Sequence, residues 1–215
     1  MPIDAIIFDL DGTLVDSADG VLSSIAGAFR KCGMSPTRPL NNEIIGPSLE
    51  QILYLLTNSE DPRVIKPLTV EFKNHYDTQG YRATKVYSGV NRLLGLLEKS
   101  SRPLFIATNK RKRPTDEIVN WLGWEKYFEA VYSLDTIQPP AANKGALISQ
   151  ILLAHQLKSE DTLYVGDRDE DHVAATQARV QFYRATWGYG NFGTFDVPES
   201  GIKKLMELLA LPTGK

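Results

Sequence analysis

The chain has 215 residues, of which 42% are hydrophobic and 23% are charged, so it is long enough for one full hydrophobic core and a small accessory domain. Its formal net charge of −2 argues against nucleic acid or an anionic membrane as a partner. Its single cysteine, Cys32, excludes an internal disulfide, and we find neither an apolar run of the ~20 residues that a membrane span needs nor a signal peptide. We therefore expect a cytoplasmic protein.

The chain opens with a short apolar strand, residues 3–8, that ends in acidic residues. Side chains two apart in extended backbone point the same way, so Asp9 and Asp11 can face one small volume. Close carboxylates repel each other and lose hydration on burial, so such pairs are kept mainly where a cation or a reacting group compensates them. In an α/β sheet, the carboxyl end of a strand is also where ligands bind.

The segment from Asp9 to Thr13 contains the groups for nucleophilic and acid–base chemistry. An ionised Asp can act as a nucleophile without a base, and a second carboxyl beside it can hold a proton and serve as general acid, then base. Gly12 lets the backbone turn tightly beside a ligand, and Thr13 adds a hydroxyl. A structural Mg²⁺ or Ca²⁺ site, or an acidic β-turn, remains an alternative for this segment alone.

The next part of the chain is almost free of strand signals. Apolar residues recur at helical spacing over residues 18–33, over residues 41–56 with an interruption at Gly46-Pro47, and over residues 62–79. Since strand-bearing regions lie on both sides of this block, we predict a helical lid inserted after the first strand. The predicted boundaries are 16–82 for the lid, and 1–15 with 83–215 for the core.

From residue 86 onward, strands and helices alternate. The expected strands are 103–107, 130–133, 162–165 and 181–185, and the expected helices are 91–99, 114–122, 144–156, 171–178 and 202–209. Such alternation is typical of an α/β fold with a doubly wound parallel sheet and right-handed crossovers. In that architecture the polar residues at strand ends collect at one edge of the sheet.

Three further strand or helix ends carry residues of interest. The Thr108 hydroxyl can donate to a phosphate oxygen, with Asn109 beside it, and Lys144 at a helix start favours an anion. Asp167 and Asp171 belong to an acid cluster after an apolar strand. Such a cluster is typical of a site for Mg²⁺, a hard cation that prefers oxygen ligands. Singly, Thr108 is also typical of a turn and Lys144 of a solvated helix.

The segment F-D-L-D-G-T-L-V-D-S resembles the first motif of the haloacid dehalogenase-like hydrolases, specifically of their phosphoglycolate-phosphatase-like branch. The Thr-Asn pair, a lysine and G-D-x-x-x-D follow in the order of that superfamily over nearly the whole chain. The helical insertion resembles the small α-helical cap of the superfamily. The resemblance implies a Mg²⁺-dependent phosphatase that acts on a small phosphorylated metabolite, such as phosphoglycolate, a sugar phosphate or a nucleotide.

The resemblance also implies a role for each motif residue. Asp9 is the nucleophile that forms an aspartyl-phosphate, and Asp11 is the acid/base. The residues that bind the phosphoryl group are Thr108, Asn109 and Lys144. The Mg²⁺ ligands are Asp9, the Asp11 backbone carbonyl and Asp167. Asp171 and Thr13 support these ligands without binding the metal or the phosphoryl group directly. Two features depart from the pattern: Gln138-Pro139-Pro140 precedes Asn143-Lys144 where Lys-Pro is frequent, and Arg168 replaces a threonine.

Other functions remain open on the sequence alone. A phosphotransferase or mutase shares the fold, whereas a dehalogenase would have no use for Asp11, and a non-catalytic binding protein need not keep Asp9 and Asp11. Residues 188–193 fit G-x-G-x-x-G, but no helix pattern follows, so we expect a loop near the cap instead of a dinucleotide site. For the basic run 110–113 we expect a solvated loop, with assistance to an anionic substrate as the alternative, and for Arg168 an acidic partner nearby in sequence. The sequence carries no signal for the oligomeric state.

Overall fold

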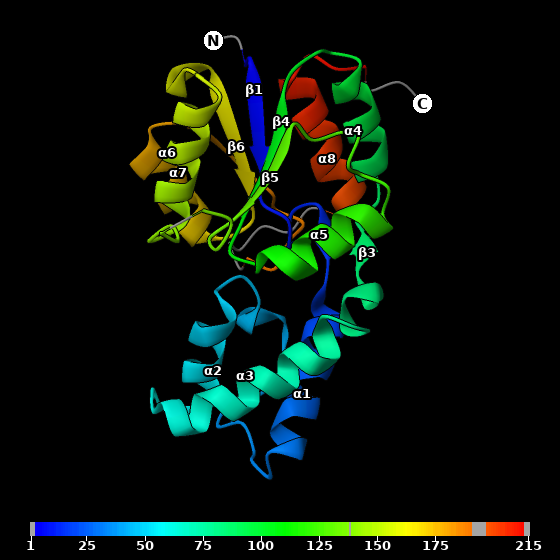
Figure 1. Ribbon diagram of the computed structural model, residues 1–215. Helices are drawn as coiled ribbons and strands as arrows, with labels where there is room; N and C mark the ends of the chain where they lie inside the picture. Colours follow the sequence, from blue (N-terminus) through cyan, green and yellow to red (C-terminus); the bar gives the residue numbers. More distant parts are fainter. Residues whose placement is uncertain (1–2, 138, 191–196, 213–215) are drawn as a thin grey trace.

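The computed structural model describes residues 3–137, 139–190 and 197–212. Within these ranges the core is a five-stranded parallel sheet of order β5-β4-β1-β6-β7. Its strands are β1 (Ala5–Phe8), β4 (Leu104–Thr108), β5 (Ala130–Ser133), β6 (Thr162–Gly166) and β7 (Gln181–Arg184). Helices cover both faces of this sheet, so the predicted doubly wound α/β fold is confirmed (Figure 1).

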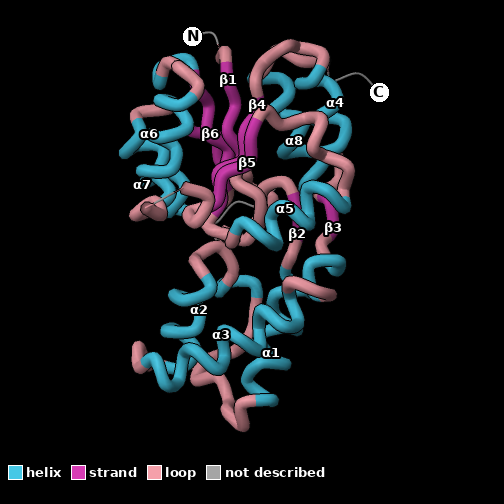
Figure 2. The backbone as a smooth tube through the Cα atoms, viewed as in Figure 1, coloured by secondary structure: helices cyan, strands magenta, loops and turns pink. Residues whose placement is uncertain are grey.

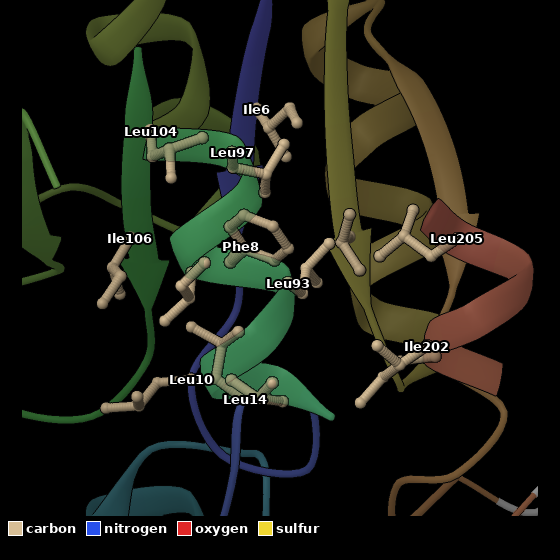
Figure 3. Packing of buried hydrophobic residues seen from close by; sticks show 14 of the residues in the cluster. Ile6, Phe8, Leu10, Leu14, Leu93, Leu97, Leu104, Ile106, Ile202 and Leu205 are labelled. Carbon is tan, nitrogen blue, oxygen red and sulfur yellow. The ribbon is translucent and has the colours of Figure 1, made fainter. Parts of the chain in front are cut away.

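Successive residues of the central strand β1 face opposite sides of the sheet. Ile6 and Phe8 pack with leucines of α4 (Val90–Glu98) and with α8 (Pro198–Leu208), as Figure 3 shows. Ala5 and Ile7 belong to a second cluster with α6 (Lys144–Ala154) and α7 (Asp169–Ala178). Because both faces are covered, β1 is apolar at every position, and its first polar side chains come where the strand ends.

A separate group of helices lies beyond the carboxyl edge of the sheet (Figures 1 and 2). These helices, α1 (Ala18–Lys31), α2 (Leu49–Thr57) and α3 (Pro62–Tyr76), bury an apolar cluster that Ile118 of the core also joins. The N-terminus of α2 is closed by a capping box between Ser48 and Gln51. The chain enters this group through β2 (Val15–Asp16) and leaves it through β3 (Lys85–Val86), which pair as a short antiparallel ribbon.

The helix boundaries differ from the predicted ones by a few residues. The segment predicted as an interrupted helix is a 3₁₀ turn, η1 (Asn42–Ile44), followed by α2, and two more 3₁₀ turns are η2 (Gly80–Ala83) and η3 (Ser159–Asp161). Helix α5 (Lys112–Trp121) begins two residues early because Asp135 accepts a hydrogen bond from the Lys112 backbone N–H. None of the described helices is both long enough and apolar enough to cross a membrane.

Candidate active site

Three neighbouring strands of the sheet carry acidic or hydroxyl side chains at their carboxyl ends. Asp9 follows β1, Thr108 ends β4 and Asp167 follows β6, and all three residues are buried. Carboxylate oxygens of Asp9, Asp167 and Asp171 lie within 4.8 Å of one another. The Thr108 hydroxyl accepts a hydrogen bond from the Lys110 backbone N–H at 3.2 Å. This bond uses the hydroxyl oxygen as an acceptor and does not use the hydroxyl hydrogen.

Lys144 is the first residue of α6 and lies among these carboxylates. Its Nζ is 2.6 Å from Oδ1 of Asp171 and 3.2 Å from Oδ1 of Asp9, and its side chain is buried. Burial alone would lower the pKa of Lys144, but Asp171 and Asp9 raise the pKa above its ordinary value. The solvated-helix interpretation is therefore wrong for this lysine, because its ammonium is held inside the site.

Asp171 holds both Lys144 and the start of α7. Its Oδ1 accepts hydrogen bonds from Lys144 and, at 3.1 Å, from the Tyr164 hydroxyl. Its Oδ2 accepts the Arg168 backbone N–H at 2.9 Å, which lets α7 begin at Asp169 instead of the predicted residue 171. Because all of these contacts are made to residues of the core, Asp171 fixes the position of the Lys144 ammonium.

Two glycines make room for Asp167. A Cβ at Gly12, whose φ is +83°, would lie 2.3 Å from Oδ2 of Asp167, and a Cβ at Gly188 would lie 2.2 Å from the Gly12 carbonyl oxygen. Asp167 accepts a hydrogen bond from the Tyr189 backbone N–H at 2.7 Å and a long one from the Thr13 hydroxyl at 3.5 Å. Any larger side chain at these glycines would displace the carboxylate or the turn that carries it.

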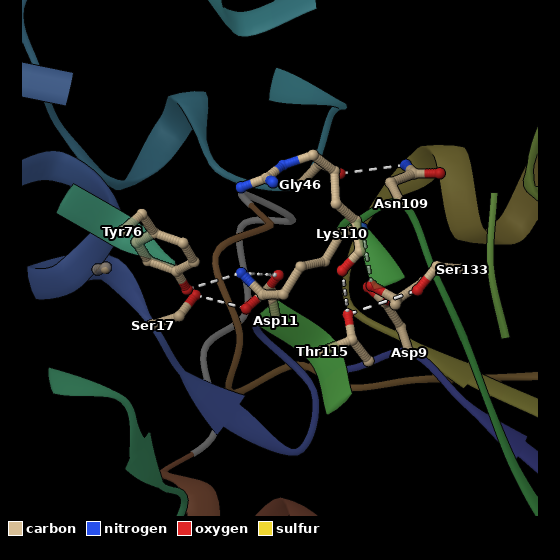
Figure 4. Close-up of polar contacts among 12 residues, drawn as sticks. Asp9, Asp11, Ser17, Gly46, Tyr76, Asn109, Lys110, Thr115 and Ser133 are labelled. Carbon is tan, nitrogen blue, oxygen red and sulfur yellow. Dashed lines mark hydrogen bonds and ion pairs between the residues drawn. The ribbon is translucent and has the colours of Figure 1, made fainter. Parts of the chain in front are cut away.

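Asp11 lies on the side of the site that faces the helical group. Its Oδ1 accepts a hydrogen bond from the Ser17 hydroxyl at 2.5 Å, and its Oδ2 is 3.0 Å from Nζ of Lys110. The same ammonium donates to the Tyr76 hydroxyl of α3 at 2.8 Å (Figure 4). Burial alone would lower the pKa of Lys110, but Asp11 and Tyr76 raise it.

The predicted solvated loop is thus wrong for Lys110, whose side chain is 7% exposed. The carboxylate of Asp11 and the hydroxyl of Tyr76 replace the water that this ammonium loses on burial. Lys110 could have been identified as a site residue from the sequence, because it directly follows Thr108-Asn109 at the end of a strand that already carries site residues. Lys112 of the same run is half exposed, as expected, but it begins helix α5 and does not lie in a loop.

Several core residues reach across to the helical group. The Asn109 side-chain amide donates to the Gly46 carbonyl at 3.1 Å, and the Arg111 guanidinium pairs with Asp77. Arg168 donates to the Asn42 carbonyl at 3.0 Å and also to the Ile45 carbonyl. The expected acidic partner for Arg168 is therefore wrong, because its side chain extends to η1 and the residue after it. Of the neighbouring acids, Asp169 pairs with Arg184 and Asp171 with Lys144.

Ser17 and Tyr189 join the site without having been predicted. The Tyr189 hydroxyl accepts the Ser17 backbone N–H at 2.7 Å and donates to Asp16 at 2.7 Å, so it ties the ribbon that leads to the helices. Tyr189 belongs to the G-x-G-x-x-G match, of which Asn191, Phe192 and Gly193 lie outside the described residues, as does Gln138 near Lys144. Ser17 could have been found because it closes the first motif.

The charges of the described side chains fit a divalent cation. Two buried ammonium groups, on Lys110 and Lys144, face four buried carboxylates. Burial raises the pKa of Asp167 to about 7, with Asp171 adding to the rise, and burial and the neighbouring acids likewise raise the pKa of Asp9. Carboxylate oxygens at this spacing, with a net deficit of positive charge, are the donors that hard divalent ions prefer.

The chain is similar to several proteins of known name over most of its length. Tyrosine-protein kinase PtkA of Mycobacterium tuberculosis is 29% identical over 197 residues, which cover 89% of this chain but 65% of PtkA. A 5'-nucleotidase of Pseudomonas aeruginosa is 27% identical, covering 86% of this chain and 84% of the relative. A phosphoglycolate phosphatase of Photobacterium profundum is 29% identical, covering 87% and 85%.

Solved structures share the fold as well. A haloacid dehalogenase-like hydrolase from Streptococcus pneumoniae, SP0104, is 30% identical with a TM-score of 0.78 over 89% of this chain and 88% of that one. A predicted phosphatase from Clostridium acetobutylicum is 26% identical with a TM-score of 0.83, covering 96% and 100%. The family described as haloacid dehalogenase-like hydrolase matches residues 6–185. The chain therefore belongs to the haloacid dehalogenase-like hydrolases.

Proposed function

We propose that this chain is a Mg²⁺-dependent phosphatase that hydrolyses the phosphomonoester of a small metabolite through an aspartyl-phosphate on Asp9. The observation that carries the proposal is the buried meeting of Asp9, Lys144 and Asp167 at the carboxyl edge of the sheet. An anionic nucleophile reaches an anionic phosphoryl group only where positive charge compensates both. Lys144 supplies part of that charge, and Asp9, Asp167 and the Asp11 backbone carbonyl would hold Mg²⁺.

In the proposed reaction, a carboxylate oxygen of Asp9 attacks phosphorus and the bond to the leaving oxygen breaks. Asp11 donates a proton to that oxygen, then accepts one from the water that hydrolyses the aspartyl-phosphate, so both groups return to their starting states. Lys144, the Thr108 hydroxyl and Asn109 bind the phosphoryl oxygens. When bound, Mg²⁺ neutralises charge on the phosphoryl group.

We propose that residues 16–82 act as the cap, with 1–15 and 83–215 as the catalytic core. The apolar cluster formed mainly by α1, α2 and α3 supports this division, as does the two-stranded ribbon through which the chain enters and leaves the cap. Ile118 of the core helix α5 joins this cluster, so apolar packing also connects cap and core. Tyr76 and the carbonyl of Gly46 contact residues that follow β4, so the cap closes over the site. Closure excludes water while Asp9 attacks, and opening releases the product.

The test is release of inorganic phosphate from phosphoglycolate, sugar phosphates and nucleoside monophosphates, each with Mg²⁺ and with EDTA. We expect release from at least one compound, with loss of release in EDTA and recovery on adding Mg²⁺. Absence of release from every compound in Mg²⁺ would contradict the proposal. Equal release with and without the chelator would contradict its metal requirement alone.

A second candidate is transfer of the phosphoryl group to an acceptor other than water, which the similarity to tyrosine-protein kinase PtkA favours. Both reactions would share the step at Asp9 and differ in what removes the phosphoryl group. Turnover in ¹⁸O-labelled water separates them. Hydrolysis places one labelled oxygen in each inorganic phosphate released, whereas transfer leaves the phosphoryl group on the acceptor without label.

A further inference from the structure

A small cavity adjoins Asp11 at the boundary between cap and core. It measures about 50 Å³, and its polar wall is formed by Asp11, Tyr76, Asn109, Lys110 and Arg111. Apolar side chains of the cap, among them Ile52 and Phe72, complete the wall. Since one water needs about 10–15 Å³ in this measure, the cavity has room for about three to five water-sized groups.

The position of Asp11 assigns this cavity to the leaving group. A general acid must lie within hydrogen-bond reach of the oxygen that it protonates, so the leaving group departs on the Asp11 side. Two larger grooves of about 510 and 790 Å³ also run along the boundary between cap and core, but Asp11 is absent from the described residues that line them. The small cavity is therefore the space that the leaving group must enter.

Of the two cations in the cavity wall, Arg111 already pairs with Asp77, and Lys110 is the one beside Asp11. Among the described residues its ammonium has two acceptors, Asp11 at 3.0 Å and the Tyr76 hydroxyl at 2.8 Å, whereas an ammonium carries three donors. The Tyr76 ring lies beneath it, with 4.7 Å between Nζ and the ring centroid. These contacts fix the ammonium at the cavity wall (Figure 4) and leave one N–H for a ligand.

We infer that Lys110 determines substrate specificity by binding an anionic group on the leaving group, with Tyr76 holding the ammonium in place. The inference rests on the proposed phosphatase function and adds a residue and a substrate class to it. A carboxylate on a chain of two or three carbons matches the room for about three to five water-sized groups. A buried ammonium gains most from an anion, because a charge-assisted hydrogen bond is about twice as strong as a neutral one.

Three phosphomonoesters of nearly equal size test this inference by charge alone. They are 2-phosphoglycolate, with a carboxylate; 2-hydroxyethyl phosphate, with a neutral hydroxyl; and O-phosphoethanolamine, with an ammonium. For the unaltered enzyme with Mg²⁺ we expect kcat/KM to fall in that order, by about 10- to 100-fold from the first to the second. The larger part of this fall is expected in KM, since the contact exists in both ground and transition states.

The variant Lys110→Met removes the charge and retains most of the side-chain volume. We expect the ratio of kcat/KM between 2-phosphoglycolate and 2-hydroxyethyl phosphate to fall to about one, and Lys110→Arg to restore part of it. This ratio is independent of any general effect on Asp11, because such an effect acts on both compounds. Lys112→Met is the matched control: Lys112 is half exposed, pairs with Asp116 and should leave the ratio unchanged.

Equal kcat/KM of the unaltered enzyme for the charged and the neutral compound would overturn the inference, and this measurement needs no variant. An unchanged ratio in folded Lys110→Met would overturn it as well, as would a preference for nucleotides over all three small compounds. In each of these cases the proposed phosphatase function stands, since phosphate is released. Release from no phosphomonoester at all would instead overturn the proposed function, and the inference with it.

Discussion

The two buried lysines of the site differ in the origin of their partners. Lys144 contacts Asp9 and Asp171, and all three belong to the sheet and its flanking helices. Lys110 contacts Asp11 of the core and Tyr76 of the cap helix α3. The first cluster is complete within the core, whereas the second is complete only while the cap lies against it.

This difference separates two tasks. Groups fixed within one packed core keep their geometry however the cap moves, which suits the steps at phosphorus. In the proposed division, groups that bridge core and cap come together only when the cap lies on the core, which suits recognition of the part of the substrate that differs between compounds. Changes in the Lys144 cluster should therefore affect every substrate alike, and changes around Lys110 should affect substrates selectively.

The largest expected effect comes from Asp9→Asn, which removes the proposed nucleophile from the core cluster. We expect phosphate release with Mg²⁺ to fall by about 10⁴-fold or more for every substrate. The thermal unfolding midpoint should stay the same or rise, because the buried repulsion among Asp9, Asp167 and Asp171 decreases. Release at near-normal rates would contradict the nucleophile assignment, and a fall limited to one substrate would contradict the separation of tasks.

Lys144→Met should be the most destabilising change in the site. It leaves Asp9 and Asp171 buried without their cation, which costs about 3–5 kcal/mol of unfolding free energy, as measured by urea titration at pH 7.5. Adding Asp171→Asn in the same chain should recover part of this loss, because one uncompensated carboxylate is gone.

The double variant is the internal control for that experiment. A loss that Asp171→Asn does not reduce would mean that Lys144 stabilises the fold by packing and not by charge. In the same titration, Lys110→Met should cost less than Lys144→Met, because Asp11 retains the hydrogen bond from Ser17 at 2.5 Å.

The effect of Mg²⁺ on stability should depend on pH. Burial raises the pKa of Asp167 from 3.8 to about 7, so the folded, metal-free protein binds more protons than the unfolded chain between these values. Its stability should therefore fall as pH rises from about 4 to 7, and Mg²⁺ should reverse the fall by binding the ionised carboxylates. We expect 5 mM Mg²⁺ to raise the unfolding midpoint by about 3–6 °C at pH 8 and by much less at pH 5.

Asp167→Asn is the control for the metal effect. This variant lacks one proposed ligand, so its unfolding midpoint should respond weakly to Mg²⁺ at both pH values and should fall less between pH 5 and pH 8 in EDTA. A pH-independent gain from Mg²⁺ in the unaltered protein would mean that the ion binds elsewhere.

The fold and the core half of the site could be predicted because each of their signals is local. Apolar runs mark the strands, and a polar residue directly after such a run lies at the carboxyl edge of a parallel sheet. Asp9, Thr108 and Asp167 could be placed at one edge by this rule. In the structure all three lie at the carboxyl ends of neighbouring strands, and the carboxylates of Asp9 and Asp167 come together. Their roles in a reaction remain predictions.

The bridging half of the site, meaning the contacts of Lys110, Arg111 and Arg168 with the cap, could not be predicted because these contacts join segments far apart in sequence. Lys110 and Tyr76 are 34 positions apart, and Arg168 and Asn42 are 126 apart, so no periodicity relates them. The ribbon of β2 and β3 has two residues in each strand, too few for an alternating pattern. Such contacts depend on how the cap lies on the core, which is a property of tertiary packing.

The smallest expected effect tests a bridging contact on the far side of Arg111, a residue that also lines the cavity. Asp77 ends α3 and pairs with Arg111 of the core, and its side chain is 5% exposed. Asp77→Asn keeps the shape and removes the charge, so closure should weaken, and KM for 2-phosphoglycolate should rise by about 2- to 5-fold while the Asp9 cluster is unchanged. Glu71→Gln is the matched control, because Glu71 lies on the same helix but pairs with Lys31 inside the cap. If both variants raise KM equally, apolar packing and not this ion pair holds the cap, and the selectivity assigned to the bridging half would rest on Lys110 and Tyr76 alone.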